Sequence, residues 1–278
     1  MKKILLGVAC LLSFEMQAIE DKQQLENDQS FPAYVNNLWD EQLKDAKEIA
    51  KEAGKKILEI RNAGYLTSKD IVLENGKKIR QTNADIQASQ YIIDELSKNY
   101  PTYGFLSQDH MDKDPNWYMK DSVWMINPID GTKEFEKGSD DFHVQIGLLR
   151  GDEAILGVSY YPATDAYVWA VKDQGAWCEI TGVKQKLVAG PSSEKILLKS
   201  SSYKVIESHF EEWKWDAVQV DDEALSSTSR LLKMIEGKAC LYISLGASAA
   251  GTEKKGGVWN YGANVVIANE SGLILKTL

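Results

Sequence analysis

The chain has 278 residues, of which 44% are hydrophobic and 26% are charged, and its formal net charge is −9. These values are ordinary for a globular protein and exclude a wholly disordered chain. The acidic balance, without any dense cluster of Lys and Arg, also argues against a nucleic-acid polymer as a partner.

The first 18 residues have the pattern of a secretory signal peptide. Lys2-Lys3 precede an apolar run at residues 4–14, and Ala18 is a small residue at the expected cleavage site. The run is too short to cross a membrane as a stable helix, and no other segment suggests a span. We expect a periplasmic or secreted protein that loses residues 1–18 and begins with a polar lead-in at 19–36. A short buried N-terminal helix is the alternative.

The elements expected first along the chain are helical. Apolar residues recur with helical spacing from 35 to 61, which predicts an amphipathic helix. Asn75-Gly76 between short apolar stretches predicts a hairpin over 68–80. A second helix is expected at 84–99, with Thr82 or Asn83 as its cap. Strands should follow at 104–107, 123–126, 144–149, 154–161 and 166–171, with one more after Gly175.

The remaining chain alternates between strands and helices. Residues 181–192 are expected to form a loop between an N-terminal α+β lobe, 37–185, and a C-terminal α/β lobe, 186–278. Strands are expected at 195–200, 239–243 and 273–275, helices at 203–213, 226–236 and 259–269, and a loop at 246–257. This alternation predicts a layered α/β architecture, and no internal repeat is visible.

The strongest functional signal is the run from Trp124 to Phe135. An apolar strand leads into Asn127-Pro128-Ile129-Asp130-Gly131-Thr132, which places a carboxylate at a strand end. Gly131 permits a close approach of the backbone, and Thr132 adds a hydroxyl. Backbone N–H groups in such a turn can face an anion.

At these residues the chain resembles the inositol monophosphatase family, whose core motif is Asp-Pro-Ile/Leu-Asp-Gly-Thr after an apolar strand. The ending Lys133-Glu134-Phe135 is similar to the 3′(2′),5′-bisphosphate nucleotidase branch. Further segments agree in order and spacing, namely Thr82–Asp85, Phe105–Asp109, Gly157–Pro162, Gly175–Trp177 and Val258–Asn260. The resemblance extends over residues 37–275 and implies an α/β (α+β layered sandwich) fold with alternating α/β/α/β/α layers.

The resemblance implies a site in which Mg²⁺ ions sit among carboxylates, activate a water and neutralise the phosphate of a small phosphomonoester. The metal ligands it implies here are Gln108, Asn127, the Ile129 carbonyl, Asp130 and Asn260. Asp85 would reach an outer metal or its water, and Thr132 would position the attacking water. The phosphate would be bound by Gly131, Thr132 and Lys133, with Arg230 as a further candidate.

Three of these positions depart from the family. Gln108 replaces a Glu, and Asn127 and Asn260 each replace an Asp, so that four ligand carboxylates fall to one, Asp130. At an effective dielectric constant of about 20, one pair of unit charges about 4 Å apart contributes roughly 4 kcal/mol. We therefore expect weak or absent Mg²⁺ binding and weak or absent catalysis. An amide also donates hydrogen bonds, so these residues could hold a phosphorylated ligand with little metal.

Two other functions remain open. Asp109, next to Gln108, can act as a replacement ligand, which would give a working Mg²⁺-dependent phosphatase that uses Asp85, Asp109 and Asp130. Alternatively, the chain is a structural or interaction subunit, because relatives extend further at the C-terminus and an uncovered edge could bind a second copy as a homodimer. His110 and His143 are expected to be structural rather than catalytic. Whether Cys178 pairs with Cys240 is also left open.

Overall fold

The computed structural model describes residues 38–72, 78–110, 116–190, 196–199, 218–221, 225–238, 241–243 and 262–273. The signal peptide, the lead-in, the expected helix at 203–213, the loop at 246–257, Cys240 and Asn260 all lie outside these residues. In chain order the elements are α2 (Asp40–Asn62), β1 (Ser68–Val72), β2 (Lys78–Thr82), α3 (Asn83–Asn99), β3 (Gly104–Ser107), η3 (Trp117–Met119), β4 (Ser122–Asp130), α4 (Thr132–Glu136), β5 (His143–Arg150), β6 (Glu153–Tyr161), β7 (Ala166–Val171), β8 (Gly175–Ile180), β9 (Val183–Leu187), β10 (Ile196–Lys199), β11 (Val218–Asp221), α7 (Ser227–Ile235), β12 (Leu241–Ile243) and α8 (Gly262–Glu270).

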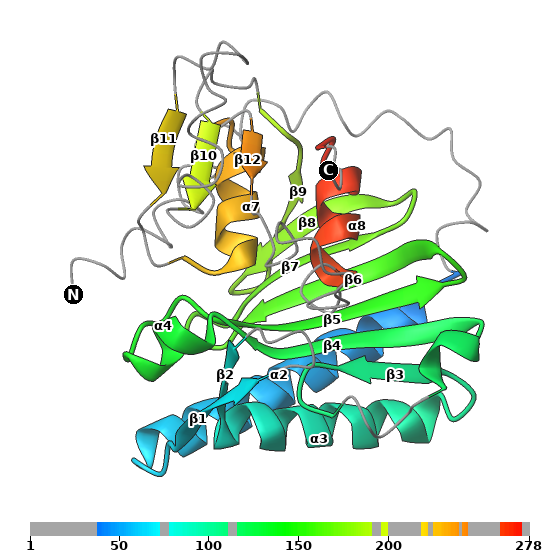
Figure 1. The fold of residues 1–278 in the computed structure, drawn as a ribbon. Coiled ribbons are helices and arrows are strands. Elements are labelled where there is room, and N and C mark those ends of the chain that lie inside the picture. Colours follow the sequence, from blue (N-terminus) through cyan, green and yellow to red (C-terminus); the bar gives the residue numbers. More distant parts are fainter. Residues whose placement is uncertain are drawn as a thin grey trace.

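A seven-stranded mixed sheet forms the centre of the fold, in the order β3-β4-β5-β6-β7-β8-β9. Strands β3 and β4 are parallel, and every later neighbour pairs antiparallel. Helices α2 and α3 lie against one face of this sheet, and α7 and α8 lie against the other (Figure 1). The sheet is therefore covered on both faces.

Strand β7 shows why both faces are apolar. Its six residues are all buried, so the sequence reads as a continuous hydrophobic run rather than as an alternation. Tyr167 and Trp169 pack with α2 and α3, whereas Val168 and Ala170 pack with α7 and α8. Alternate side chains thus belong to two separate cores, one on each side of the sheet.

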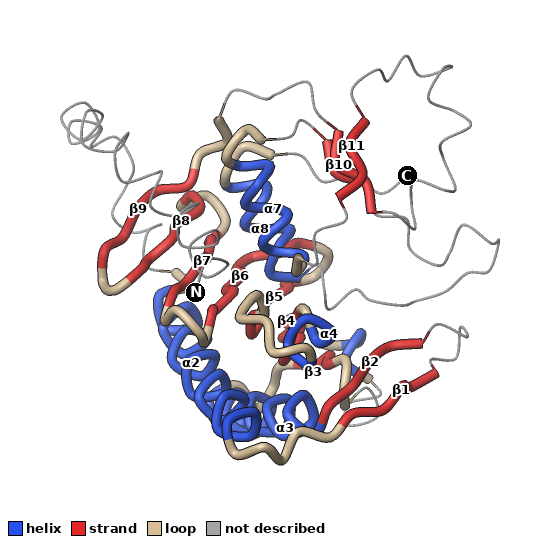
Figure 2. The backbone as a smooth tube through the Cα atoms, turned by 90° about the vertical axis from the view of Figure 1, so that its left-hand side faces the viewer, coloured by secondary structure: helices blue, strands red, loops and turns tan. Residues whose placement is uncertain are grey.

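A second, smaller sheet has three parallel strands in the order β11-β10-β12 and lies beside α7 (Figure 2). Helices, sheet, helices and second sheet follow one another, which confirms the predicted layered α/β fold. The hairpin of β1 and β2 projects from the α3 side. No helix among the described residues is long and apolar enough to cross a membrane.

Several predicted elements need correction. Residues 183–187 form β9, the edge strand of the large sheet, where a loop was expected, and the lobe boundary drawn after 185 falls inside it. The sequence did not indicate this strand because most of its side chains are polar or charged. An edge strand can have such side chains because few of them are buried. Strand β11 and the short helices η3 and α4 were not predicted either, because elements of three to five residues are too short to show a periodic pattern.

Candidate metal and phosphate site

The site begins with an irregularity in β4. Asn127 pairs with Gln145 and Asp130 with His143, so β4 contains one more residue than β5 in this interval. The bulge contains Pro128, which has no N–H to give to the ladder of a central strand. The strand is buried along its whole length, and it runs through the proline to Asp130 rather than ending at 126 as the sequence suggested.

Gly131 makes the turn from β4 into α4. Its φ is +89°, in the left-handed region, and a Cβ there would lie 2.8 Å from the carbonyl oxygen of Asp141. Only glycine therefore fits without strain. The Thr132 hydroxyl lies 2.9 Å from the Ile129 carbonyl oxygen and 3.3 Å from Asp85 Oδ1. The turn thus brings together three residues that the sequence predicted as a group.

Asp85 is fully buried at the start of α3. Its carboxylate accepts the backbone N–H of Thr82 at 2.8 Å and the Thr82 hydroxyl, which confirms Thr82 as the helix cap. Burial, and after it the nearby charge of Asp109, outweigh these hydrogen bonds and raise the pKa of Asp85 to about 7. An acid in this state is costly to ionise unless a cation approaches it.

Asp109 lies close enough to Asp85 for their negative charges to repel each other. Its Oδ1 accepts a hydrogen bond from Gln81 Nε2 at 2.6 Å, and its Oδ2 is buried with no partner among the described residues. Burial raises the pKa of Asp109 to about 6, although the hydrogen bond from Gln81 lowers it. Two neighbouring carboxylates with raised pKa values, one with an unpaired oxygen, fit a divalent cation.

The Asp130 side chain contacts the first turn of α7. Its Oδ2 accepts the backbone N–H of Ser227 at 2.6 Å and the Ser227 hydroxyl at 2.8 Å, and it lies 3.5 Å from His143 Nδ1. Burial alone would raise the pKa of Asp130, but His143 and Ser227 outweigh it and hold the pKa below its ordinary value. The predicted ligand Asp130 is therefore an ionised group engaged by the first turn of α7.

His143 is enclosed between two carboxylates. Its Nε2 lies 3.0 Å from Ser226 Oγ and 3.5 Å from Asp141 Oδ1, and its ring is fully buried. Burial lowers the pKa of His143, but Asp130 and Asp141 overcome that effect and raise it. The raised pKa favours the protonated ring, and Nε2 faces the Asp141 carboxylate as well as Ser226, so the contact with Ser226 does not by itself make that serine a nucleophile.

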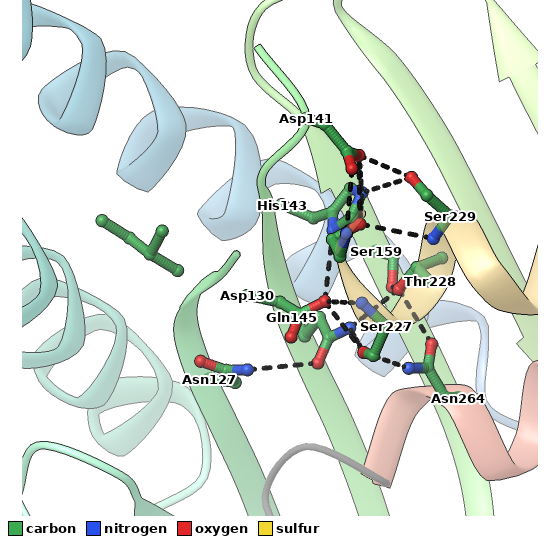
Figure 3. A network of polar contacts seen from close by, with 12 residues as sticks. Asn127, Asp130, Asp141, His143, Gln145, Ser159, Ser227, Thr228, Ser229 and Asn264 are labelled. Carbon is green, nitrogen blue, oxygen red and sulfur yellow. Dashed lines mark hydrogen bonds and ion pairs between the residues drawn. The ribbon is translucent and has the colours of Figure 1, made fainter. Parts of the chain in front are cut away.

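Asp141 closes this group on the side of α7. It accepts hydrogen bonds from the Ser226 backbone N–H at 2.9 Å, from the Ser226 hydroxyl at 3.0 Å and from the Ser229 hydroxyl at 2.5 Å. Figure 3 shows the resulting network of polar contacts between the strands, α7 and α8. Sequence reasoning expected His143 to be structural but missed Asp141 and Ser227, because 85 and 97 residues separate them from the partners that they contact.

The remaining predicted site residues are placed as follows. Gln108 follows β3 and is partly buried, with its backbone N–H bonded to the Ile126 carbonyl at 3.3 Å. Asn127 is buried and donates to Gln145 at 3.4 Å. Lys133 is exposed, and Arg230 is buried in the first turn of α7. Within the described residues no three His, Cys, Asp or Glu side chains form a metal-binding group.

His110 and Cys178 have structural surroundings. The His110 Nδ1 lies 2.8 Å from Ser89 Oγ. Cys178 is buried and forms no disulfide with any residue that the structure describes, among which Cys240 is not included.

Comparisons with known proteins agree on one family. The Inositol monophosphatase family matches residues 39–277. The 3′(2′),5′-bisphosphate nucleotidase CysQ of Escherichia coli K12 is 25% identical over 228 residues, which cover 81% of this chain and 86% of that protein. An inositol-1-monophosphatase of Caulobacter vibrioides is 39% identical over 98 residues, which cover 34% of this chain and 37% of its own.

Solved structures agree on the fold. The staphylococcal SaIMPase-II with bound inositol monophosphate has a TM-score of 0.61 and 19% identity, covering 82% of this chain and 78% of its own. The same enzyme with bound 2′AMP has a TM-score of 0.61 and 20% identity, covering 82% and 79%. The family model spans residues 39–277, which include the bulged strand, the Gly131 turn and α8, and this chain is therefore a member of the Inositol monophosphatase family.

Proposed function

We propose that the chain binds a small phosphomonoester at the Gly131 turn and hydrolyses it slowly or not at all. The observation that carries the proposal is the state of Asp130, whose Oδ2 is engaged by Ser227 and His143. Asp130 is the carboxylate that remains where the family has four, so the part of the site around it has lost most of its charge. The retained turn supports binding, and the reduced charge supports weak turnover.

The ligand class follows from the relatives and from the turn. Relatives are named for bisphosphate nucleotides and inositol phosphates, and a neighbouring fold binds inositol monophosphate and 2′AMP. Backbone N–H groups at Gly131 and Thr132 suit a phosphate oxygen. The amide groups of Gln108 and Asn127 can add donors that a carboxylate cannot supply.

The part of the site around Asp85 and Asp109 fits one divalent cation. Mg²⁺ held there would lower the pKa of a bound water and would neutralise charge on a phosphate. The hydroxyl of Thr132, between Asp85 and the Ile129 carbonyl, is placed to orient such a water. The amides at 108, 127 and 260 leave a second cation with little negative charge to hold it.

A working Mg²⁺-dependent phosphatase is the second candidate function. Asp109 Oδ2, which has no partner in the described part of the chain, and the repulsion between Asp109 and Asp85 favour it, because a cation would relieve both costs. In this case Asp109 replaces the charge that Gln108 lacks.

Phosphate release separates the two functions. The full chain is assayed on inositol monophosphate, 2′AMP and a 3′,5′-bisphosphorylated nucleotide, with Mg²⁺ or with a chelator, beside E. coli CysQ. We expect a thermal shift with at least one of these compounds and turnover at least about a hundredfold below that of CysQ. Turnover comparable to CysQ supports the second function. No shift and no turnover would refute both and favour an interaction subunit, which size measurement in solution would reveal as a homodimer.

We propose in addition that residues 1–18 direct export, on the pattern of Lys2-Lys3, the apolar run and Ala18. Intact mass of the protein purified from its own cells should give a mature chain beginning at Ile19. A chain that begins at Met1 and stays with the cytoplasmic fraction would contradict export.

A further inference from the structure

Five hydrogen bonds join Asn127 to Asp130 by a route through α7 and α8 (Figure 3). Asn127 Nδ2 lies 3.4 Å from Gln145 Oε1, and Gln145 Nε2 lies 2.8 Å from Thr228 Oγ1. Thr228 Oγ1 lies 2.9 Å from Asn264 Oδ1, and Asn264 Nδ2 lies 2.8 Å from Ser227 Oγ. The Ser227 hydroxyl then reaches Asp130 Oδ2 at 2.8 Å. Both ends of the route are residues of the bulge in β4.

The direction of this chain is fixed at the Asp130 end. An ionised carboxylate only accepts hydrogen bonds, so the single proton of the Ser227 hydroxyl points to Asp130. Ser227 Oγ must then accept from Asn264, and it also lies 3.4 Å from Gln145 Nε2. The Asp130 carboxylate therefore determines which group donates in both the Ser227–Asp130 and the Asn264–Ser227 hydrogen bond.

The same reasoning continues to the other end. The Asn264 amide gives its N–H to Ser227, so its oxygen accepts from Thr228, and Thr228 in turn accepts from Gln145. The oxygen of Gln145 is left facing Asn127, which must donate. Asn127, Gln145, Thr228 and Asn264 are at most 6% exposed, whereas Ser227 is partly exposed. Water therefore cannot readily replace a missing partner at the four buried side chains.

We infer that Asn127 is required as a hydrogen-bond donor, and that Gln145, Thr228, Asn264 and Ser227 are positioning residues that tie its orientation to that of Asp130. A carboxylate at 127 has no donor and would face the oxygen of Gln145. Relief would require the amides of Gln145 and Asn264 to flip and the hydroxyls of Thr228 and Ser227 to turn. Ser227 would then donate to Asn264, and Asp130 would lose that hydrogen bond.

The chain thus couples two positions of the motif through residues that need not touch a ligand. The amide of Asn127 is part of a hydrogen-bonded network that includes side chains of α7 and α8. An amide in place of a carboxylate at 127 therefore does more than remove one negative charge. The inference concerns the protein without ligand, so it holds independently of the proposed function.

A double-mutant cycle of Asn127→Asp and Ser227→Ala tests the coupling. Unfolding equilibrium constants of the full chain are measured in urea at alkaline pH, where the new carboxyl is ionised. Without the Ser227 hydroxyl the chain is free to reverse, so Asn127→Asp should raise the unfolding constant by a factor about two- to tenfold smaller in the Ser227→Ala background. Equal factors in both backgrounds, within about twofold, would overturn the inference.

Ser229→Ala is the matched control. Its hydroxyl donates to Asp141 and is outside the chain, although it comes from the same turn of α7. The effects of Asn127→Asp and Ser229→Ala should multiply without coupling. Coupling as large as that with Ser227 would mean that α7 responds as a whole, and it would also overturn the inference.

Side-chain amide NMR gives a second test that does not depend on the folding of Asn127→Asp. In Ser227→Ala the NH₂ signals of Asn264 and Gln145 should shift, and the signal of Asn127, which Ser227 does not contact, should shift with them. In Ser229→Ala the Asn127 signal should stay in place. A shift that ends at Asn264 and Gln145 would show that no directed chain reaches Asn127.

Discussion

Ser227 binds the Asp130 carboxylate twice, through its backbone N–H at 2.6 Å and through its hydroxyl at 2.8 Å. The carboxylate is at the end of β4, and the serine opens α7, 97 residues later. A charge at the N-terminal end of a helix is stabilised by the N–H groups that have no partner in the helix. The two halves of the chain are therefore joined at the centre of the candidate site.

Ser227→Ala removes one of these two hydrogen bonds and keeps the other. Hydrogen bonds to charged groups contribute about 1.5–3 kcal/mol, and the backbone N–H remains, so we expect a loss of about 1–2 kcal/mol in the free energy of unfolding. Urea denaturation measures it. Ser97→Ala, whose hydroxyl bonds only to the Asp94 carbonyl in α3, should change stability by at most about 0.5 kcal/mol. Equal losses in the two variants would contradict the role of Ser227.

Asp109→Asn should stabilise the metal-free protein. The amide keeps an oxygen for Gln81 and removes the charge that repels Asp85. We expect a higher Tm in chelator and a smaller gain of Tm on adding Mg²⁺, because the variant has one carboxylate fewer for the cation. Differential scanning calorimetry with and without Mg²⁺ reports both changes. A Tm that falls in chelator would mean that the carboxylate has another partner.

Stability in chelator should increase as the pH falls from about 8 to about 5. The pKa values of Asp85 and Asp109 are raised to about 7 and about 6, so the folded state takes up protons in this range while the unfolded carboxyls stay ionised. The state that binds more protons is favoured by acid, which is the folded one here. His143, with its raised pKa, acts in the same direction.

Asp109→Asn serves to separate these contributions. The variant should show a shallower rise of Tm over the same range, because Asp109 no longer takes up a proton. Some rise should remain, because Asp85 and His143 still do. The carboxyls with lowered pKa values, Asp130 and Asp141, should destabilise the protein only at more acidic pH, as they take up protons there. A Tm of the unaltered protein that falls steadily from pH 8 to 5 would contradict the description of the Asp85–Asp109 pair.

Restoring the three carboxylates together should restore Mg²⁺ binding. We expect Gln108→Glu, Asn127→Asp and Asn260→Asp to tighten Mg²⁺ binding by at least about tenfold, because each adds a charge near the cation. Adding Ser227→Ala should tighten it further, since it relieves the conflict at 127 and removes one of the two hydrogen bonds from Ser227 to Asp130 Oδ2. Isothermal titration calorimetry compares the triple and quadruple variants. Weaker binding in the quadruple variant would show that Ser227 assists the metal site.

Gly157→Ala should destabilise the protein through α8. A Cβ on Gly157 would clash with the backbone of Ala263, where α8 crosses β6. Overpacking of this kind costs about 1–3 kcal/mol, and a clash with backbone leads us to expect the upper part of that range. Gly190→Ala is the matched control, because its Cβ would meet nothing closer than 3.6 Å. Chemical denaturation of both variants measures the difference.

The sequence predicted the residues of the Gly131 turn but not their partners. Asp85, Ile129 and Thr132 come together as the resemblance to the family implied, and no local pattern predicts the contact between Asp85 and Thr132, which are 47 residues apart. The role of Ser227 could not be predicted from spacing, since its contact with Asp130 depends on how α7 crosses the sheet. A run of four Ser and Thr at 226–229 was the available signal, as such residues cap helices and bind carboxylates.

Local sequence patterns also explain which elements of the fold could be predicted and which could not. The buried run of β7 and the stripe of α2 are long enough to identify from periodicity. The edge strand β9 has two lysines in five residues, and its pairing with β8 is a tertiary feature. Short edge elements follow their neighbours more than their own sequence.

The bulge at Pro128 has a consequence for how this site can change over time. Backbone pairing of β4 with β5 sets the separation of Asn127 and Asp130, and it does so with protein groups alone. A frame of this kind keeps its shape when ligand charge is exchanged for an amide, because backbone hydrogen bonds form it. Selection can therefore alter what the site binds one residue at a time, while the strand that carries it continues to fold.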